Sequence, residues 1–115
     1  MITLYGINNC DTVKKARRWL EENGIDYRFH DFRVDGLTAN QVTDWSQQLG
    51  WETLVNKRST TWKQLDETER ATMDANSSIN AMVEHPTLIK RPVLDNNGEL
   101  LVGFKPETYQ DHFSS

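Results

Sequence analysis

The first thirty or so residues follow the pattern of a strand, a helix and a second strand, and this order constrains the fold more than any other feature. A short apolar run at residues 2–5 is followed by apolar side chains at helical spacing from Asp11 to Glu22. Asn23-Gly24 ends the helix, and apolar and polar residues then alternate over residues 27–32. Two sheet strands joined by a single crossover helix lie parallel. The pattern therefore predicts a βαβ unit.

The last third of the chain returns to strands. Residues 91–95 and 99–103 flank Asn96-Asn97-Gly98, and an Asn-Gly pair favours the positive φ angles of a tight hairpin turn. Pro106 is placed to open a short helix that extends to Phe113, because proline is well tolerated in a first helical turn. We therefore expect two strands and a helix, ββα, at this end.

The middle third is predicted to be helical. Thr38 and Gln41 have the spacing of a capping box, and apolar residues follow at helical intervals until Gly50. Beyond it we expect a polar connector at residues 56–61 and a short helix at residues 66–75.

A further helix in this region is predicted to run to about Glu84, with Ser77 or Ser78 as its N-cap, before Pro86 stops it. The predicted order is thus βαβ, a helical insertion, then ββα.

Length and charge narrow the class of protein. A chain of 115 residues is long enough for one domain, and its formal charge of −4 disfavours binding to nucleic-acid phosphates. The sequence has no run of 18 apolar residues, and a strand pattern begins at once, so we expect neither a membrane span nor a signal peptide. A single cysteine cannot form an intramolecular disulfide, which suits a reducing compartment, and we expect the cytoplasm.

That cysteine is the main candidate for chemistry. Cys10 follows a short turn and immediately precedes the predicted helix from Asp11. The unpaired N–H groups of a helix start favour a thiolate over a thiol. His30, His85 and His112 have no metal-ligand spacing with one another or with Cys10, and no metal is expected. With one sulfur in the chain, a mixed disulfide at Cys10 must be resolved by an external thiol, for which glutathione is the obvious candidate.

Three stretches carry a resemblance to a known family. They are Tyr5 to Arg17 with its cysteine, His30 to Arg33 before Gly36-Leu37, and Ile89 to Pro92. On these residues the chain resembles the arsenate reductase-like (ArsC/Spx/YffB) family, and most closely its small YffB-type members. The resemblance implies an α/β, thioredoxin-like fold with a mixed sheet. It also implies a single ArsC-like domain over residues 1–115, with a core at about 1–35 and 86–115 and a helical insertion at about 36–85.

The resemblance also implies a set of site residues. Arg91-Pro92 should form a cis peptide beside a catalytic Cys10, with Arg91 as the main electrostatic stabiliser and the backbone at Pro92 able to pair with an extended peptide. Arsenate reductases of this class place three arginines around the sulfur. Arg91 matches one of these three positions. The first family arginine aligns near Asn56, with Arg58 two residues further on, and the third aligns near Lys105. Lys14, one helical turn beyond Cys10, joins Arg58 and Lys105 as a candidate for binding substrate carboxylates.

The function expected from these features is that of an enzyme, a glutathione-dependent thiol reductase that uses Cys10 as its nucleophile. Its partners would be glutathione and an oxidised small-molecule or protein thiol. One alternative is arsenate reduction by the same cysteine. Another is a non-catalytic protein that docks on RNA polymerase as Spx does, although Cys10-Asp11-Thr12-Val13 lacks the second cysteine of the Spx C-x-x-C switch, and we do not expect polymerase as a partner.

Overall fold

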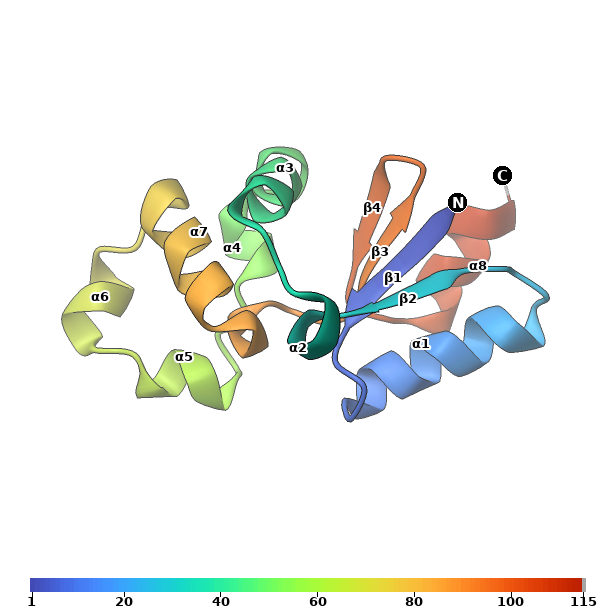
Figure 1. Cartoon of the computed structure of the whole chain (residues 1–115), viewed down its shortest axis with the longest axis horizontal. Coiled ribbons are helices and arrows are strands. Elements are labelled where there is room, and N and C mark those ends of the chain that lie inside the picture. The colour runs from blue at the N-terminus through green and yellow to red at the C-terminus, as the bar shows by residue number, and fades with distance from the viewer. Residues whose placement is uncertain (115) are drawn as a thin grey trace. The chain divides into compact units, whose positions relative to one another are not determined.

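A computed structural model describes residues 1–114 and divides the chain into two compact units (Figure 1). The first unit comprises residues 1–36 together with the segment from residue 91 onward, and the second comprises residues 37–90. None of the helices within residues 1–114 is long and apolar enough to cross a membrane.

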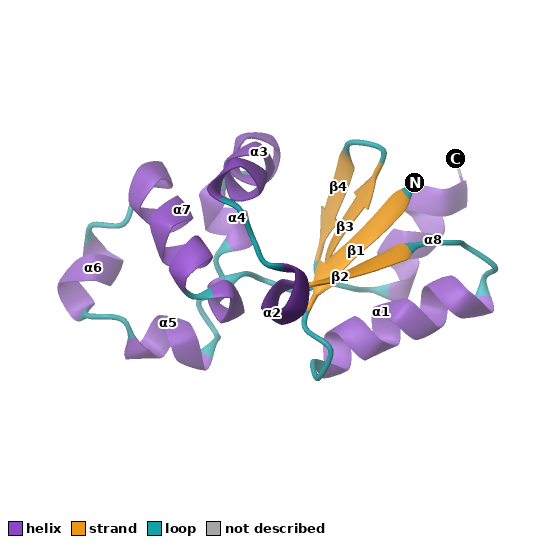
Figure 2. Ribbon diagram, viewed as in Figure 1, coloured by secondary structure: helices purple, strands orange, loops and turns teal. Residues whose placement is uncertain are grey.

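The first unit is built on a four-stranded mixed sheet. Its strands are β1 (Ile2–Gly6), β2 (Arg28–Asp31), β3 (Val93–Asn96) and β4 (Glu99–Val102), in the spatial order β2-β1-β3-β4. β1 pairs in parallel with β2 and antiparallel with β3, and β3 and β4 form an antiparallel hairpin. Figure 2 shows the four strands lying side by side.

Two helices, α1 (Asp11–Glu22) and α8 (Pro106–Ser114), bury one face of this sheet. The core cluster joins side chains of β1, α1, β3 and α8, all with 0% exposure: Leu4, Val13, Ala16, Leu20, Leu94 and Tyr109. The apolar positions that predicted an amphipathic α1 therefore face the sheet, as expected for helical periodicity. The predicted βαβ and ββα units and the thioredoxin-like α/β fold are confirmed, although the first strand of the hairpin begins at Val93 rather than at residue 91 and includes Asn96.

Local turn signals account for the ends of these elements. α1 begins and ends where the sequence predicts, and Gly24 after it adopts a φ of 68°, a left-handed conformation that favours glycine. The β3–β4 turn is formed by Asn97 and Gly98 with φ angles of 53° and 98°. These are the positive φ angles that the Asn-Gly pair predicted.

The expected second strand is too long at both of its ends. β2 covers Arg28–Asp31, and Phe32 already begins a one-turn helix, α2 (Phe32–Asp35). The cause is Asp31, whose Oδ1 accepts a hydrogen bond of 2.8 Å from the Arg33 N–H and so caps α2. A side-chain cap of this kind turns the chain out of the strand before Phe32.

The second unit is helical and has a core of its own. Its elements are α3 (Ala39–Leu49), α4 (Trp51–Leu54), α5 (Thr60–Gln64), α6 (Glu67–Ala71), α7 (Ala75–Glu84) and the 3₁₀ turn η1 (Pro86–Leu88). The predicted capping box of α3 is present, with Thr38 and Gln41 each accepting a hydrogen bond from the backbone N–H of the other. Buried apolar side chains fill the interior of this unit: Val42, Trp45, Leu54, Val55, Ala81, Met82, Leu88 and Ile89.

Two expected boundaries in this unit are wrong. The polar connector at 56–61 is shorter than predicted, because α5 begins at Thr60 with Ser59 as its cap. The helix expected at residues 66–75 is shorter and covers only Glu67–Ala71, which is α6.

The cap of α7 is neither Ser77 nor Ser78 but Asp74, whose Oδ1 accepts from the Ser77 N–H at 2.8 Å while the Ser77 hydroxyl accepts from the Asp74 N–H. The Ser78 hydroxyl instead donates back to the Ala75 carbonyl inside the helix.

Candidate active site

Cys10 sits between the end of β1 and the start of α1. The turn at residues 7–9 leads to it, and its backbone N–H donates to the Ile7 carbonyl at 3.3 Å. Cys10 is the N-cap residue of α1, with extended φ and ψ of −99° and 125°, and its carbonyl accepts the first helical hydrogen bond from the Lys14 N–H at 3.0 Å. The thiol is therefore held at the positive end of the helix dipole, as the sequence predicts.

The close packing of β1 on α1 depends on Gly6. A Cβ atom at Gly6 would lie 2.7 Å from Val13 Cγ2, which is closer than real Cβ contacts allow. Gly6 therefore lets the first turns of α1 approach the end of β1, and this approach sets the position of Cys10.

Opposing influences act on the thiol. Cys10 is partly buried against the core cluster, and burial is the largest single influence, raising the pKa of the thiol. The Val13 N–H, the guanidinium of Arg91 and the Thr12 N–H stabilise the thiolate, and together they outweigh burial, so the net pKa lies below its ordinary value. Cys10 makes no conventional side-chain cap hydrogen bond, and the first-turn N–H groups act on the charged form of the sulfur.

The sheet register brings Arg91 to this sulfur. Tyr5 near the end of β1 pairs with Val93 at the start of β3, so the residues just before β3 lie at the same end of the sheet as the turn before Cys10. The Arg91–Pro92 peptide is cis, Pro92 is buried, and its carbonyl accepts a hydrogen bond of 2.8 Å from the Gly103 N–H after β4. Arg91 thus reaches Cys10 from a backbone held by two strands.

The other predicted cations occupy different places. Lys14 and Lys105 are exposed in the first unit; Lys14 lies on α1, and the Lys105 carbonyl accepts the Tyr109 N–H at the start of α8. Among residues 1–114, the side-chain cation that lowers the pKa of Cys10 is Arg91. Arg58 is exposed in the second unit, where its N–H donates to Asn56 Oδ1 at 3.0 Å.

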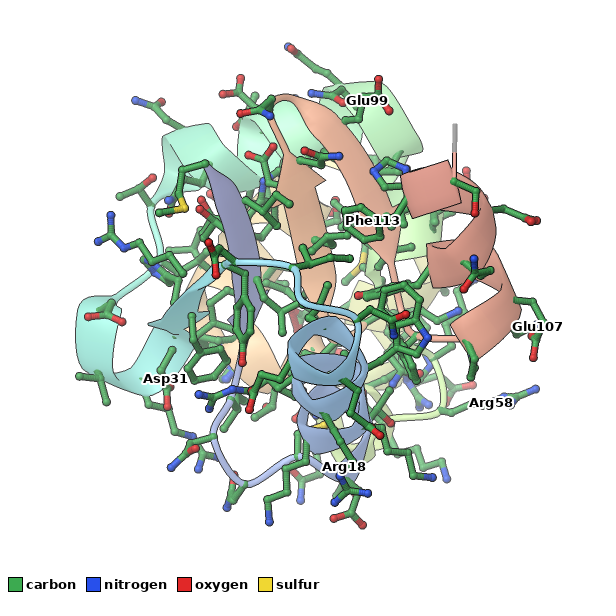
Figure 3. All side chains as sticks on the ribbon, turned by 90° about the vertical axis from the view of Figure 1, so that its right-hand side faces the viewer. Arg18, Asp31, Arg58, Glu99, Glu107 and Phe113 are labelled. Carbon is green, nitrogen blue, oxygen red and sulfur yellow. The ribbon has the colours of Figure 1, made fainter. Side chains whose placement is uncertain are left out.

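The exposed face of α1 beside the thiol is basic. Lys14, Lys15 and Arg18 are all exposed, and Figure 3 shows Arg18 directed away from the sheet. Arg17 is turned inward instead, with its Nε donating to the Tyr27 hydroxyl at 2.9 Å and its guanidinium 4.2 Å from the centre of the Phe29 ring. We define the basic face of α1 as Lys14, Lys15 and Arg18. The exposed Asp11, next to Cys10 and one turn before Lys14 and Lys15, carries the opposite charge and reduces the attraction of this face for anions.

One polar group near the cysteine was not identified from the sequence. Asp31 is 9% exposed, and its Oδ2 accepts a hydrogen bond of 3.2 Å from the Asn8 N–H in the turn before Cys10. The sequence signals were an acidic residue where a strand pattern ends and its place in the stretch His30 to Arg33, which carries part of the family resemblance. In residues 1–114 no group of three or more His, Cys, Asp or Glu side chains is placed to hold a metal ion.

Comparisons with known proteins show the family to which this chain belongs. The chain is 50% identical over 114 residues to a Haemophilus influenzae protein named only as uncharacterized, covering 99% of this chain and 100% of that one. A solved structure of a YFFB protein superposes with a TM-score of 0.93 at 43% identity, covering 96% of this chain and 97% of the other. The global transcriptional regulator Spx 2 of Bacillus anthracis is 28% identical, over 93% of this chain and 82% of the regulator. The sequence model of the ArsC family matches residues 5–112, and the chain therefore belongs to the ArsC family.

Proposed function

We propose that this protein is a glutathione-dependent thiol–disulfide oxidoreductase in which Cys10 is the nucleophile and Arg91 stabilises its thiolate. The observation that carries the proposal is the setting of the sulfur, where the N–H groups of the first turn of α1 and one guanidinium together lower the pKa of the thiol despite its partial burial. A thiolate that is also partly accessible is the reactive form of cysteine.

The reaction consists of two thiol–disulfide exchanges. In the first, the Cys10 thiolate attacks the glutathione sulfur of a mixed disulfide R–S–S–G, a Cys10–glutathione disulfide forms, and R–S⁻ leaves and takes up a proton. In the second, the thiolate of another glutathione attacks the glutathione sulfur on Cys10, which releases oxidised glutathione and restores the Cys10 thiolate. The net reaction converts R–S–S–G and one free glutathione into R–SH and oxidised glutathione, whose other half comes from the mixed disulfide.

Lowering the pKa of Cys10 helps the second exchange more than the first. A lower pKa increases the thiolate fraction, but the intrinsic nucleophilicity of the sulfur falls at the same time, with a Brønsted slope of about 0.4–0.5. The two effects largely offset each other during attack. When glutathione attacks the mixed disulfide, however, a stabilised Cys10 thiolate is the better leaving group.

The use of glutathione is supported by the number of sulfurs and by the charges nearby. The chain has one cysteine, so the second thiol must come from outside. Glutathione carries two carboxylates and one ammonium group, and the exposed Lys14 on the basic face of α1 is suited to bind a carboxylate. We extend the same role to Lys105 and Arg58. We assign pairing with the extended tripeptide to the backbone flanking Pro92, because Pro92 itself has no N–H and its carbonyl already accepts from the Gly103 N–H. The requirement for a reduced cysteine fits the cytoplasm.

A coupled assay tests this proposal. Reduction of hydroxyethyl disulfide is followed as NADPH consumption in the presence of glutathione and glutathione reductase, for the wild type and Cys10→Ser. Two Arg91 variants serve as a matched pair, because Arg91→Lys keeps the positive charge and Arg91→Met removes it. We expect the loss of activity to increase from Arg91→Lys to Arg91→Met to Cys10→Ser, and equal turnover in wild type and Cys10→Ser would refute the proposal.

Arsenate reduction is a second candidate, because the guanidinium of Arg91 at the sulfur is also a suitable group to stabilise an oxyanion. The family resemblance implies three arginines for that reaction, and in this chain one of them, Arg91, is matched. Arsenate replaces the disulfide in the same assay with glutaredoxin added. A rate above that of Cys10→Ser would favour arsenate as the substrate.

The similarity to a transcriptional regulator raises a third candidate, a docking protein without turnover. The chain has a single cysteine, which leaves no partner for an intramolecular redox switch. Affinity capture from lysate distinguishes this role from catalysis. Recovery of polymerase subunits by both wild type and Cys10→Ser would favour docking, and their absence would dismiss it.

A further inference from the structure

A nearly buried carboxylate, Asp31, lies where β2 passes into α2, and thiol exchange at Cys10 has no direct use for it (Figure 3). Its two oxygens serve different segments. Oδ1 accepts from the Arg33 N–H at 2.8 Å, which caps α2, whereas Oδ2 accepts from the Asn8 N–H at 3.2 Å. The Asp31 backbone N–H donates in turn to Asp35 Oδ2 at 3.1 Å. The carboxylate therefore connects α2 to a turn 23 residues earlier in the chain.

That turn determines where the cysteine stands. It is closed by the hydrogen bond from the Cys10 N–H to the Ile7 carbonyl, and Asn8 is its second residue. Ile7 is 3% exposed and anchors one end of the turn in the interior, whereas the side chains of Asn8 and Asn9 are exposed. The bond from the Asn8 N–H to Asp31 thus holds the outer part of the turn, where the side chains of Asn8 and Asn9 are exposed.

We propose that Asp31 is a positioning residue for the thiol of Cys10, with its carboxylate holding the turn that sets the sulfur against the first turn of α1 and Arg91. The inference rests on the proposed function of Cys10. Asp31 itself touches neither substrate nor sulfur in this scheme. It acts through the hydrogen bond that its Oδ2 accepts from the Asn8 N–H.

The decisive variant is Asp31→Asn. Asparagine is as good an N-cap as aspartate, so its oxygen can still accept from the Arg33 N–H, while its NH₂ group faces the Asn8 N–H and two donors meet. Loosening the turn moves the sulfur away from the N–H groups of α1 and from Arg91, which raises the pKa of Cys10. Removing a negative charge without any movement would lower that pKa or leave it unchanged. The sign of the change therefore separates positioning from simple electrostatics.

The pKa of Cys10 is measured from thiolate absorbance at 240 nm, and its reactivity from the rate of alkylation by iodoacetamide at fixed pH. Neither measurement needs turnover. Asp35→Asn is the matched control, because Asp35 accepts the Asp31 N–H at the other end of α2 and, within residues 1–114, forms no hydrogen bond with the turn before Cys10. We expect Asp31→Asn to raise the pKa and to lower kcat/KM by about tenfold, mainly through kcat, as a small misplacement of a reacting group does. Asp35→Asn should leave both unchanged.

The outcomes can be told apart. An ordinary thiol pKa in the wild type would refute both this inference and the proposed function. A low wild-type pKa that is unchanged or lowered further in Asp31→Asn would refute the positioning role alone. If Asp31→Asn does not fold, Asp31→Ser replaces it, since serine keeps a cap oxygen for Arg33 and lacks the second oxygen. The same increase in pKa is then required.

Discussion

Replacing Gly6 by alanine should strain the contact that fixes α1 against β1. Gly6 has no positive φ, so its backbone accepts alanine, and the cost comes from the side chain. The added Cβ would lie 2.7 Å from Val13 Cγ2 and 3.2 Å from Val13 Cγ1. Val13 is 0% exposed within the core cluster, where it has little room to retreat.

The size of the effect follows from these distances. Ordinary contact begins at 3.4 Å, so the nearest pair must separate by 3.4 − 2.7, or about 0.7 Å. Overpacking of this kind costs about 1–3 kcal/mol in the free energy of unfolding. For a chain of this size that corresponds to a Tm lower by about 4–12 °C. Because α1 begins directly after Cys10, the same shift should slow alkylation of the thiol.

The matched control is Val13→Ala. It removes both Cγ atoms and leaves the Val13 Cβ at 3.6 Å from the new methyl group, which is ordinary contact. In the Val13→Ala background, Gly6→Ala should be neutral or stabilising by about 0.4–1 kcal/mol, because alanine restricts the unfolded chain. Urea denaturation of the four proteins gives the coupling energy. Equal costs of Gly6→Ala in the two backgrounds would refute the steric argument.

Three other expectations test the charges and the core. The pKa of Cys10 is lower in the folded chain than in the unfolded chain. The unfolding free energy of wild type minus that of Cys10→Ser should therefore be largest above about pH 8.5 and decline as the pH falls through the folded pKa. A difference that does not change with pH in urea denaturation would contradict this. Lys14→Gln should raise the KM for glutathione by about 1.4- to 5-fold with kcat unchanged, since an exposed charge pair contributes about 0.2–1 kcal/mol, while Lys15→Gln should have a smaller effect; equal effects would remove Lys14 as a specific ligand. Tyr109→Phe should raise stability by about 1 kcal/mol, because the Tyr109 hydroxyl is buried with no hydrogen-bond partner among residues 1–114. Tyr27→Phe, which loses a hydroxyl that accepts one hydrogen bond and donates another, should lower the Tm instead.

The elements that were predicted well are those with strong local signals. α1 has three turns of apolar periodicity and a glycine after its end, α3 has a capping box, and the β3–β4 hairpin has an Asn-Gly turn. The four- and five-residue helices α2, α4 and α5 were missed, because one turn is too short to show a helical period. The cap of α7 was misassigned to the serines because Asp74, Ser77 and Ser78 are all good caps, and the choice among them depends on where the chain enters the helix.

For the candidate site too, the local sequence pattern predicts the features set by neighbouring residues and not those set by distant segments. The place of Cys10 at a helix start depends on adjacent residues, and the sequence indicates it. The approach of Arg91 to Cys10 depends on the register of β1 with β3, and residue spacing alone does not contain that information. The bond between Asp31 and Asn8 requires β2 to lie parallel to β1, so that the ends of both strands meet at one edge of the sheet.

By itself, the sequence determined the order of the strands and of the longer helices α1, α3, α7 and α8, the parallel pairing of β1 with β2, and the position of the one sulfur at the start of α1. Each of these depends on periodicity, caps and turns that act over a few residues. Tertiary structure decided which charged groups meet that sulfur and which groups support it, because contacts between Cys10 and Arg91 or between Asn8 and Asp31 exist only once the sheet has brought distant segments together.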